Sequence, residues 1–225
     1  MIRHLLPGAV ACAETFSDLP STVLFAEEEA AVSGAVASRR QEFTTVRACA
    51  RTAFGELGLP VVPLPPGRRG EPTWPHGVVG SMTHCTGYRA AAVAVSHRVT
   101  SVGIDAEQHE PLPQGVLRLV ASTEEQLRLQ HLARREPELC WDRVLFSAKE
   151  SLYKAWYPLD RRRLDFADAD VVVDPAGTFT ARLSGAVRLP GGGALTELTG
   201  RWAVAAGLVL TAVSVSAGAA PTAAA

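Results

Sequence analysis

Val102-Gly-Ile-Asp-Ala-Glu107, followed about forty residues later by Phe146-Ser-Ala-Lys-Glu-Ser-Leu-Tyr-Lys-Ala-Trp156, gives the strongest structural signal in this chain. In the first segment apolar and polar residues alternate, which predicts a β-strand. The period of two sends Gly103, Asp105 and Glu107 to one side of that strand and the apolar residues toward the core. The second segment repeats its apolar residues at helical spacing, so it predicts an amphipathic helix.

The predicted helix has two different faces. At about 100° per residue, its core face consists of four apolar residues, Leu145, Ala148, Leu152 and Ala155. The opposite face mixes aromatic, acidic and basic residues, namely Arg143, Phe146, Glu150, Tyr153, Lys154 and Tyr157, with Lys149 at its flank. A surface ion pair between Glu150 and Lys154 would stabilise a helix by only roughly 0.2–0.5 kcal/mol and leaves the aromatic residues unexplained.

Three carboxylates in these segments indicate a site for a hard divalent cation. Asp105 and Glu107 lie about 7 Å apart along the strand, close enough to converge on one ion, and Glu150 supplies the third carboxylate. Oxygen ligands without a neighbouring His or Cys suit Mg²⁺ or Mn²⁺ better than zinc. Alone, the acidic pair would equally fit an exposed strand edge, but the helix face, with Lys149 and Lys154, favours a metal and a phosphorylated ligand.

The composition restricts the class of protein. The 225 residues suffice for one sizeable core or for two small halves packed together. With 47% hydrophobic residues, 20% charged residues and a net charge of −1, we expect a globular protein that binds neither nucleic acid nor a membrane. The four cysteines have neither disulfide nor zinc-ligand spacing, and Pro7-Gly8 interrupts the apolar run at 5–13, which is a poor signal peptide. We therefore expect a cytoplasmic protein.

The remaining patterns predict an α+β fold. The expected helices cover residues 27–58, 124–135 and 141–157, and the expected strands cover 78–95 with a turn at 86–87, 98–107, 169–173, 178–183 and 202–215. A loop rich in proline and glycine covers 63–77. The tail at 217–225 has nothing to bury, so we expect it to be disordered.

These motifs resemble the signature of 4'-phosphopantetheinyl transferases. The strand and helix segments match the family pattern G-x-D-x-E and F-S-x-K-E-S-x-Y-K-A. Three upstream stretches, Gly70–Pro75, Gly80–Cys85 and Arg47–Arg51, resemble further family motifs in the same order. The match is closest to the monomeric group that activates siderophore, nonribosomal-peptide and polyketide synthases.

The resemblance implies both an architecture and a reaction. It implies two similar α+β halves related by a pseudo-twofold axis, with the active site in the cleft between them. We place the halves at residues 1–100, with the coenzyme A motifs, and 101–216, with the metal and catalytic motifs. The implied enzyme is a monomer that transfers the 4'-phosphopantetheine arm of coenzyme A to a serine of acyl or peptidyl carrier proteins. It releases 3',5'-ADP and depends on Mg²⁺, with Mn²⁺ as the other candidate.

The resemblance also assigns roles to individual residues. The implied metal ligands are Asp105, Glu107 and Glu150, and the implied catalytic residues are Glu150, Lys154 and Asp105. Coenzyme A would be bound by Arg39, Arg47, Arg69, Ser81, Thr83, His84, Lys149 and Lys154. Arg69 stands where the family usually has a lysine, so its charge is retained but its geometry is not assured.

Two other functions fit part of the pattern. A Mg²⁺-dependent phosphodiesterase or nuclease could use the same acidic triad, but a nuclease usually needs a basic face, which a net charge of −1 without a long basic run does not provide. A non-catalytic coenzyme A-binding module would need no cluster of three carboxylates. Ligand affinity without any turnover would favour that module.

Overall fold

The computed structural model describes residues 1–19, 22–162, 164–189 and 193–218. Its helices and antiparallel sheets confirm the predicted α+β class. No helix in these ranges is long and apolar enough to span a bilayer. The predicted disordered tail at 217–225 lies mostly outside the described residues.

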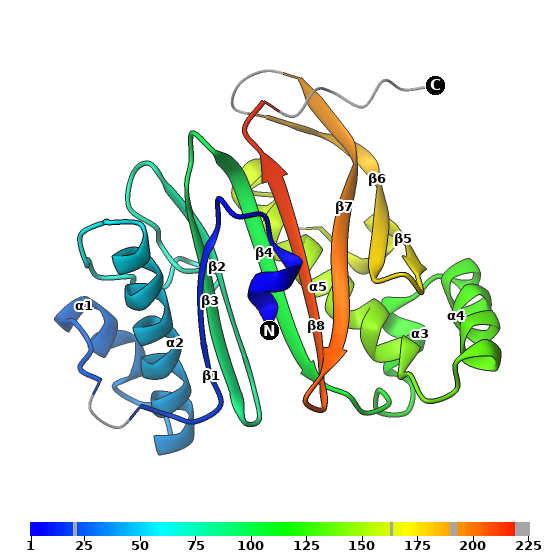
Figure 1. Ribbon diagram of the computed structural model, residues 1–225, viewed down its shortest axis with the longest axis horizontal. Helices are drawn as coiled ribbons and strands as arrows, with labels where there is room; N and C mark the ends of the chain where they lie inside the picture. The colour runs from blue at the N-terminus through cyan, green and yellow to red at the C-terminus, as the bar shows by residue number, and fades with distance from the viewer. Residues whose placement is uncertain (20–21, 163, 190–192, 219–225) are drawn as a thin grey trace.

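The first sheet belongs to the N-terminal part of the chain. It consists of β1 (Ala11–Thr15), β2 (Val78–Cys85) and β3 (Tyr88–Val95) in the order β1-β3-β2. The long helix α2 (Ala37–Glu56) packs on β1 and β3, as Figure 1 shows. The helix buries Ala50 and Phe54 against Ala91 and Val93 of β3 and against Leu64 of the following loop. The apolar spacing of α2 thus gives this part a small core of its own.

The second sheet contains β4 (Val99–Gln108), β5 (Ala169–Asp174), β6 (Thr178–Arg188), β7 (Ala194–Ala205) and β8 (Leu208–Ser216). Their order is β4-β8-β7-β6-β5. Helix α5 (Trp141–Asp160) lies across β4 and β8, with α3 (Val116–Val120) and α4 (Thr123–Arg135) beside it (Figure 1).

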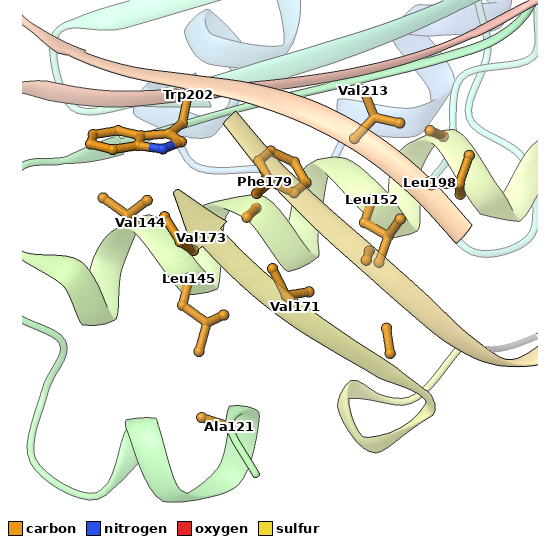
Figure 2. Close-up of a cluster of buried hydrophobic side chains, with 14 of the residues drawn as sticks. Ala121, Val144, Leu145, Leu152, Val171, Val173, Phe179, Leu198, Trp202 and Val213 are labelled. Atoms are coloured by element: carbon orange, nitrogen blue, oxygen red, sulfur yellow. The ribbon is translucent and has the colours of Figure 1, made fainter. Parts of the chain in front are cut away.

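The core of this second part confirms the face that was predicted for α5. Leu145 and Leu152 lie in one buried apolar cluster with Val171 and Val213 (Figure 2). Ala148 and Ala155 are fully buried as well. The apolar face of the helix is used in the core, and its polar face therefore remains available for a functional site.

The two sheets meet along β2 and β4, which are joined by side chains. The hydroxyl of Ser81 accepts the Ile104 N–H at 3.0 Å, and the hydroxyl of Thr83 accepts the Ala106 N–H at 3.1 Å. From Ser81 to Thr83 on β2, the bonded residue on β4 changes from Ile104 to Ala106, so the two strands run parallel. A single apolar cluster also contains Tyr88 of the first sheet and Ile104 and Leu210 of the second, which means that the two parts share a core. The pseudo-twofold similarity of the halves and the boundaries at 1–100 and 101–216 stay predictions.

Gly103 lets α5 lie directly on β4. A Cβ atom added to Gly103 would meet the Ala155 nitrogen at 2.5 Å and would lie closer still to the Ser151 carbonyl oxygen. Any side chain there would therefore collide with the backbone of the helix. The glycine of the G-x-D-x-E pattern is explained by this close approach.

Two predicted helix boundaries are wrong. The helix expected over 27–58 is divided into α1 (Ala26–Glu29), a 3-10 turn at Ala30–Val32 and α2, because Gly34 favours a break and Val36 is extended. The helix expected to stop at Tyr157 continues to Asp160 with Pro158 inside its last turn. A proline so close to a helix end removes only one backbone hydrogen bond. The helix is capped by Arg161, whose N–H bonds to the Tyr157 carbonyl oxygen at 2.8 Å.

Two strand predictions also need correction. The strand expected over 202–215 is part of the hairpin of β7 and β8, which turns at Ala206 and Gly207 with φ of 51° and 74°. Positive φ at both positions is the type I′ geometry, but the usual Asn-Gly or Asp-Gly signal is absent. Strand β1 was not predicted, because its Ala-Cys-Ala-Glu-Thr sequence has little β propensity. It is stabilised by pairing with β3.

Candidate active site

Asp105 is the buried centre of the site. It lies on β4 with 4% of its surface exposed. One carboxylate oxygen accepts Lys154 Nζ at 2.7 Å and the Thr83 hydroxyl at 3.3 Å, and the other accepts the Ser147 hydroxyl at 2.8 Å. Lys154 also donates to the Ile104 carbonyl at 3.1 Å. Burial of this charge is tolerated because each carboxylate oxygen is hydrogen-bonded.

Glu107 follows on the same strand and is held by a different cation. Its carboxylate lies 2.9 Å from Arg143 Nη1, and Arg143 is fixed in turn by the carbonyls of Glu110 and Pro111. Burial raises the pKa of Glu107, the charge of Asp105 raises it further, and Arg143 opposes both effects. Burial is thus the main cause of the raised pKa, and the neighbouring charge of Asp105 is the second.

Glu150 projects from α5 toward the same acidic region. Burial raises its pKa, Lys154 lowers it in opposition, and the charges of Asp105 and Glu107 raise it further. The three predicted carboxylates are thus near enough to influence one another. As their side chains lie, however, no three acidic, His or Cys groups in the described ranges form a ready metal cluster. The donor set fits Mg²⁺ in chemical type, but an ion would have to displace Lys154 and Arg143 from the carboxylates.

A cavity of about 460 Å³ opens beside Glu150. Its walls combine charged and apolar side chains, namely Arg69, Lys149, Glu150, Leu152, Tyr153, Leu164, Asp165, Phe166 and Ala169. All of these except Arg69 follow residue 148 in the sequence. A cavity of this size and character suits a ligand that has both polar and apolar parts.

Lys149 is buried more deeply than the sequence suggested. Its side chain is 3% exposed, and Nζ donates to Glu125 and to the Phe166 carbonyl, each at 2.8 Å. The Glu125 carboxylate also accepts the backbone N–H groups of Ser122 and Val171. Lys149 therefore joins α5 to α4, β5 and the wall of the cavity, and both of its observed bonds are to the protein itself.

His84 and Arg39 form a pair on the N-terminal part. Arg39 Nη1 lies 2.7 Å from His84 Nε2. A guanidinium can only donate, so Nε2 accepts and the ring of a neutral His84 carries its proton on Nδ1. Burial lowers the pKa of His84; Glu42 raises it, whereas Arg39, Lys154 and Arg89 lower it. The pair presents a cation and a neutral imidazole that can gain a proton when an anion binds.

The structure does not bring Arg47 to this pair. Arg47 is 5% exposed, donates to the Leu64 and Phe43 carbonyls, and lies 3.8 Å from the fully buried Glu28. Burial lowers its pKa to about 10. The eight-residue spacing from Arg39 allowed a shared face, but the need to neutralise Glu28 turns Arg47 inward.

The other predicted ligand-binding residues occupy different places. Ser81 and Thr83 are each 3% exposed and use their hydroxyls to join β2 to β4. Arg69 lies at the cavity, with its guanidinium 5.7 Å from the centre of the Tyr157 ring. Among these three residues, only Arg69 therefore has a side chain in a position to reach a ligand in the cavity.

Sequence reasoning missed the side chains that hold the site residues. Arg143 was placed on the polar face of the helix without a role, and Ser147 was only part of a motif. Glu125 carries a recognisable signal, because Ser122 and Glu125 form a capping box at the start of α4. Its second role as the partner of Lys149 depends on tertiary packing, which no local pattern reveals.

Fold and site together define an α+β protein with acidic and basic groups around a cavity, the arrangement of an enzyme for a charged ligand. Two family models match the chain: "4'-phosphopantetheinyl transferase N-terminal domain" over residues 27–94 and "4'-phosphopantetheinyl transferase superfamily" over residues 101–205. The chain therefore belongs to the 4'-phosphopantetheinyl transferase superfamily.

Three curated relatives cover almost the whole chain. The 4'-phosphopantetheinyl transferase Svp of Streptomyces mobaraensis is 54% identical over 96% of this chain and 90% of its own length. The transferase PptT of Mycobacterium tuberculosis is 45% identical over 95% and 97%, and Npt of Nocardia iowensis is 42% identical over 95% and 99%. The protein is accordingly an enzyme that transfers phosphopantetheine from coenzyme A to carrier proteins, in a family that generally uses a divalent metal.

Proposed function

We propose that the transfer takes place between Asp105, Glu150 and the adjoining cavity, with Mg²⁺ held by Asp105, Glu107 and Glu150. The observation that carries this proposal is the buried Asp105, hydrogen-bonded by Lys154 and Thr83, next to two carboxylates of raised pKa. A bound Mg²⁺ would neutralise charge on the diphosphate of coenzyme A. The chain's own residues account for the remaining steps.

Glu150 is proposed to accept the proton of the carrier serine. The serine oxygen forms a bond to the β-phosphorus of coenzyme A, and the bond from that phosphorus to the bridging oxygen breaks. The electron pair of the broken bond leaves with 3',5'-ADP. A carboxylate within hydrogen-bond reach of the attacking hydroxyl can act as its general base. Lys154, already 2.7 Å from Asp105, supplies positive charge to the phosphate oxygens.

Coenzyme A is proposed to extend from the His84–Arg39 pair to the cavity. Arg39 and His84 suit a phosphate group, and Arg69 supplies positive charge at the cavity. The pantetheine arm has amide and hydroxyl groups on an apolar chain, which matches walls that combine Tyr153 and Phe166 with charged residues. Arg47, Ser81, Thr83 and Lys149 contribute by fixing the elements that carry these side chains.

The partners are proposed to be acyl or peptidyl carrier proteins of siderophore, nonribosomal-peptide or polyketide synthases. We also propose that the enzyme acts in the cytoplasm as a monomer. Size-exclusion chromatography with light scattering tests the monomer, since a dimer would double the mass of 23.8 kDa.

Mass spectrometry of a carrier protein tests the proposed function. Apo carrier, coenzyme A and Mg²⁺ should give a carrier whose mass increases by one phosphopantetheine, and a chelator should abolish the increase. Asp105→Asn should lower turnover by orders of magnitude while the protein stays folded. Carriers of several types that remain unmodified would contradict the proposal, and hydrolysis of coenzyme A without carrier modification would favour a phosphodiesterase.

A further inference from the structure

The segment Pro65–Thr73, called the proline loop below, is a closed loop of the N-terminal part with a bridge between Pro66 and Pro72. The Thr73 N–H bonds to the Pro65 carbonyl at 2.9 Å, and the Gly67 N–H bonds to the Glu71 carbonyl at 2.6 Å. At its tip Gly70 has φ of 87°, a conformation that glycine adopts without strain. Two backbone hydrogen bonds thus close the base of the loop, and a third, from the Gly70 N–H to the Gly67 carbonyl at 3.1 Å, closes its tip. The glycines of the loop add conformational freedom that must be removed elsewhere.

The proline loop supplies the one cavity wall that does not come from the C-terminal part. Arg69 lines the cavity, and every other described lining residue lies between Lys149 and Ala169. Its guanidinium lies 5.7 Å from the Tyr157 ring centre, within range of a cation–π contact. Tyr157 stacks on Tyr153, which lines the same cavity. The position of Arg69 relative to α5 therefore determines the shape and the charge of the cavity at this wall.

The carboxylate of Glu71 touches both partners of that contact. One oxygen accepts the Arg69 backbone N–H at 2.9 Å, and the other is 3.5 Å from the Tyr157 hydroxyl and 4.0 Å from Arg161 Nη1. The carboxylate also packs over Gly67, where an added Cβ would lie 2.5 Å from Glu71 Cδ. The loop is therefore folded around this side chain, and the side chain connects it to α5.

We propose that Glu71 is a positioning residue that holds Arg69 at the cavity for coenzyme A. The inference rests on the proposed contact between Arg69 and coenzyme A, and it adds that the contact depends on Glu71. A hydrogen bond to a charged group contributes more than a neutral one, and here it fixes the backbone of the residue that carries the cation. Loss of Glu71 releases the loop but leaves Asp105 and Glu150 in place. The Michaelis constant for coenzyme A should change, and the rate at saturation should not.

A double-mutant cycle on purified full-length enzyme tests the proposal. Arg69→Ala and Glu71→Ala should each raise KM for coenzyme A about tenfold, equal to about 1.4 kcal/mol, with kcat within about twofold of the parent. If Glu71 acts through Arg69, the double variant should have the KM of Arg69→Ala alone. Multiplied effects in the double variant would show independent action and overturn the proposal.

Two further variants separate positioning from charge. Glu71→Gln keeps an oxygen that can accept the Arg69 N–H, so it should restore most of the coenzyme A affinity that Glu71→Ala loses. Gly67→Ala leaves the carboxylate intact but displaces it, so its KM should rise toward that of Glu71→Ala. Glu197→Ala is the matched control, because Glu197 pairs with Arg182 on β6, away from the proline loop.

The outcomes distinguish this inference from the proposed function. An unchanged KM in Arg69→Ala would remove Arg69 from the coenzyme A site and the inference with it. A raised KM in Arg69→Ala with an unchanged KM in Glu71→Ala would overturn the inference alone. A fall in kcat at unchanged KM in Glu71→Ala, or a loss in Glu71→Gln as large as in Glu71→Ala, would also overturn it.

Discussion

Replacing Gly103 by alanine should damage both stability and turnover, because one methyl group must enter the contact between β4 and α5. The new Cβ would lie 2.5 Å from the Ala155 nitrogen, whereas ordinary contacts begin at 3.4 Å. The Ser151 carbonyl oxygen would lie nearer still, so helix α5 must withdraw by at least about 1 Å, and overpacking of this kind costs about 1–3 kcal/mol. The same helix carries Glu150 and Lys154. A misplacement of about 1 Å in catalytic groups can lower turnover about 100-fold.

Urea unfolding followed by circular dichroism measures the first effect of Gly103→Ala, and modification of a carrier protein at saturating coenzyme A measures the second. The matched control is Gly185→Ala on β6, which adds the same methyl group to a strand where nothing lies within 4 Å. The control should keep both stability and turnover. A Gly103→Ala protein within about 0.5 kcal/mol of the parent would refute the predicted clash. A destabilised Gly103→Ala protein with a normal rate would refute the idea that helix position limits catalysis.

Three other changes probe the site. Glu150→Gln should abolish most turnover in the carrier assay while the protein stays folded, because its carboxylate is the proposed ligand and base; a normal rate would remove it from the mechanism. Glu125→Ala should destabilise the protein by about 3–5 kcal/mol in urea unfolding, since it leaves the Lys149 charge buried without its carboxylate partner. Lys149→Met should lower the free energy of unfolding by less. The reverse order of the two variants would contradict the buried ion pair. His84 should titrate below its ordinary pKa of 6.5 in NMR. Its contribution to stability is then present above pH 6.5 and lost as the pH falls through the lower pKa of the folded state. Arg39→Ala should raise the titration midpoint of His84. A midpoint above 6.5 in the parent would contradict the burial of His84.

The sequence predicts the parts of this fold in which local pattern and burial agree. The β2–β3 hairpin was predicted from two strand-like runs with a turn at Thr86-Gly87, and the strand β4 was placed within one residue at each end. Prediction failed where tertiary contacts override local preference. Strand β1 is weak by propensity and is stabilised by β3, and α5 continues through Pro158 because a helix end tolerates the lost N–H.

The sequence predicts candidate site residues, whereas the contacts of those residues are seen only in the structure. The charges of Asp105 and Glu107 act on Glu150, as the two periodicities predict, but no three acidic groups in the described residues form a ready metal cluster, so their role as metal ligands stays a prediction. Burial was harder to foresee, because a period of 3.6 places a basic residue on a face but does not show what covers that face. Lys149 is covered by Glu125, and both are almost inaccessible to solvent. The distinction between a ligand-binding residue and a supporting one is therefore made by tertiary packing.

The position of Asp105 explains why the proposed site lies where the two sheets meet. A buried carboxylate stays charged only if enough donors surround it, and no single element provides them here. Thr83 comes from β2 in the N-terminal part, whereas Ser147 and Lys154 come from α5 in the C-terminal part. Because Thr83 also accepts the Ala106 N–H, one hydroxyl both joins the sheets and stabilises the carboxylate. A shift between the two parts would therefore weaken both the junction and the hydrogen bonds that hold Asp105 at the proposed reaction centre, so the proposed catalytic geometry depends on the packing of the whole fold.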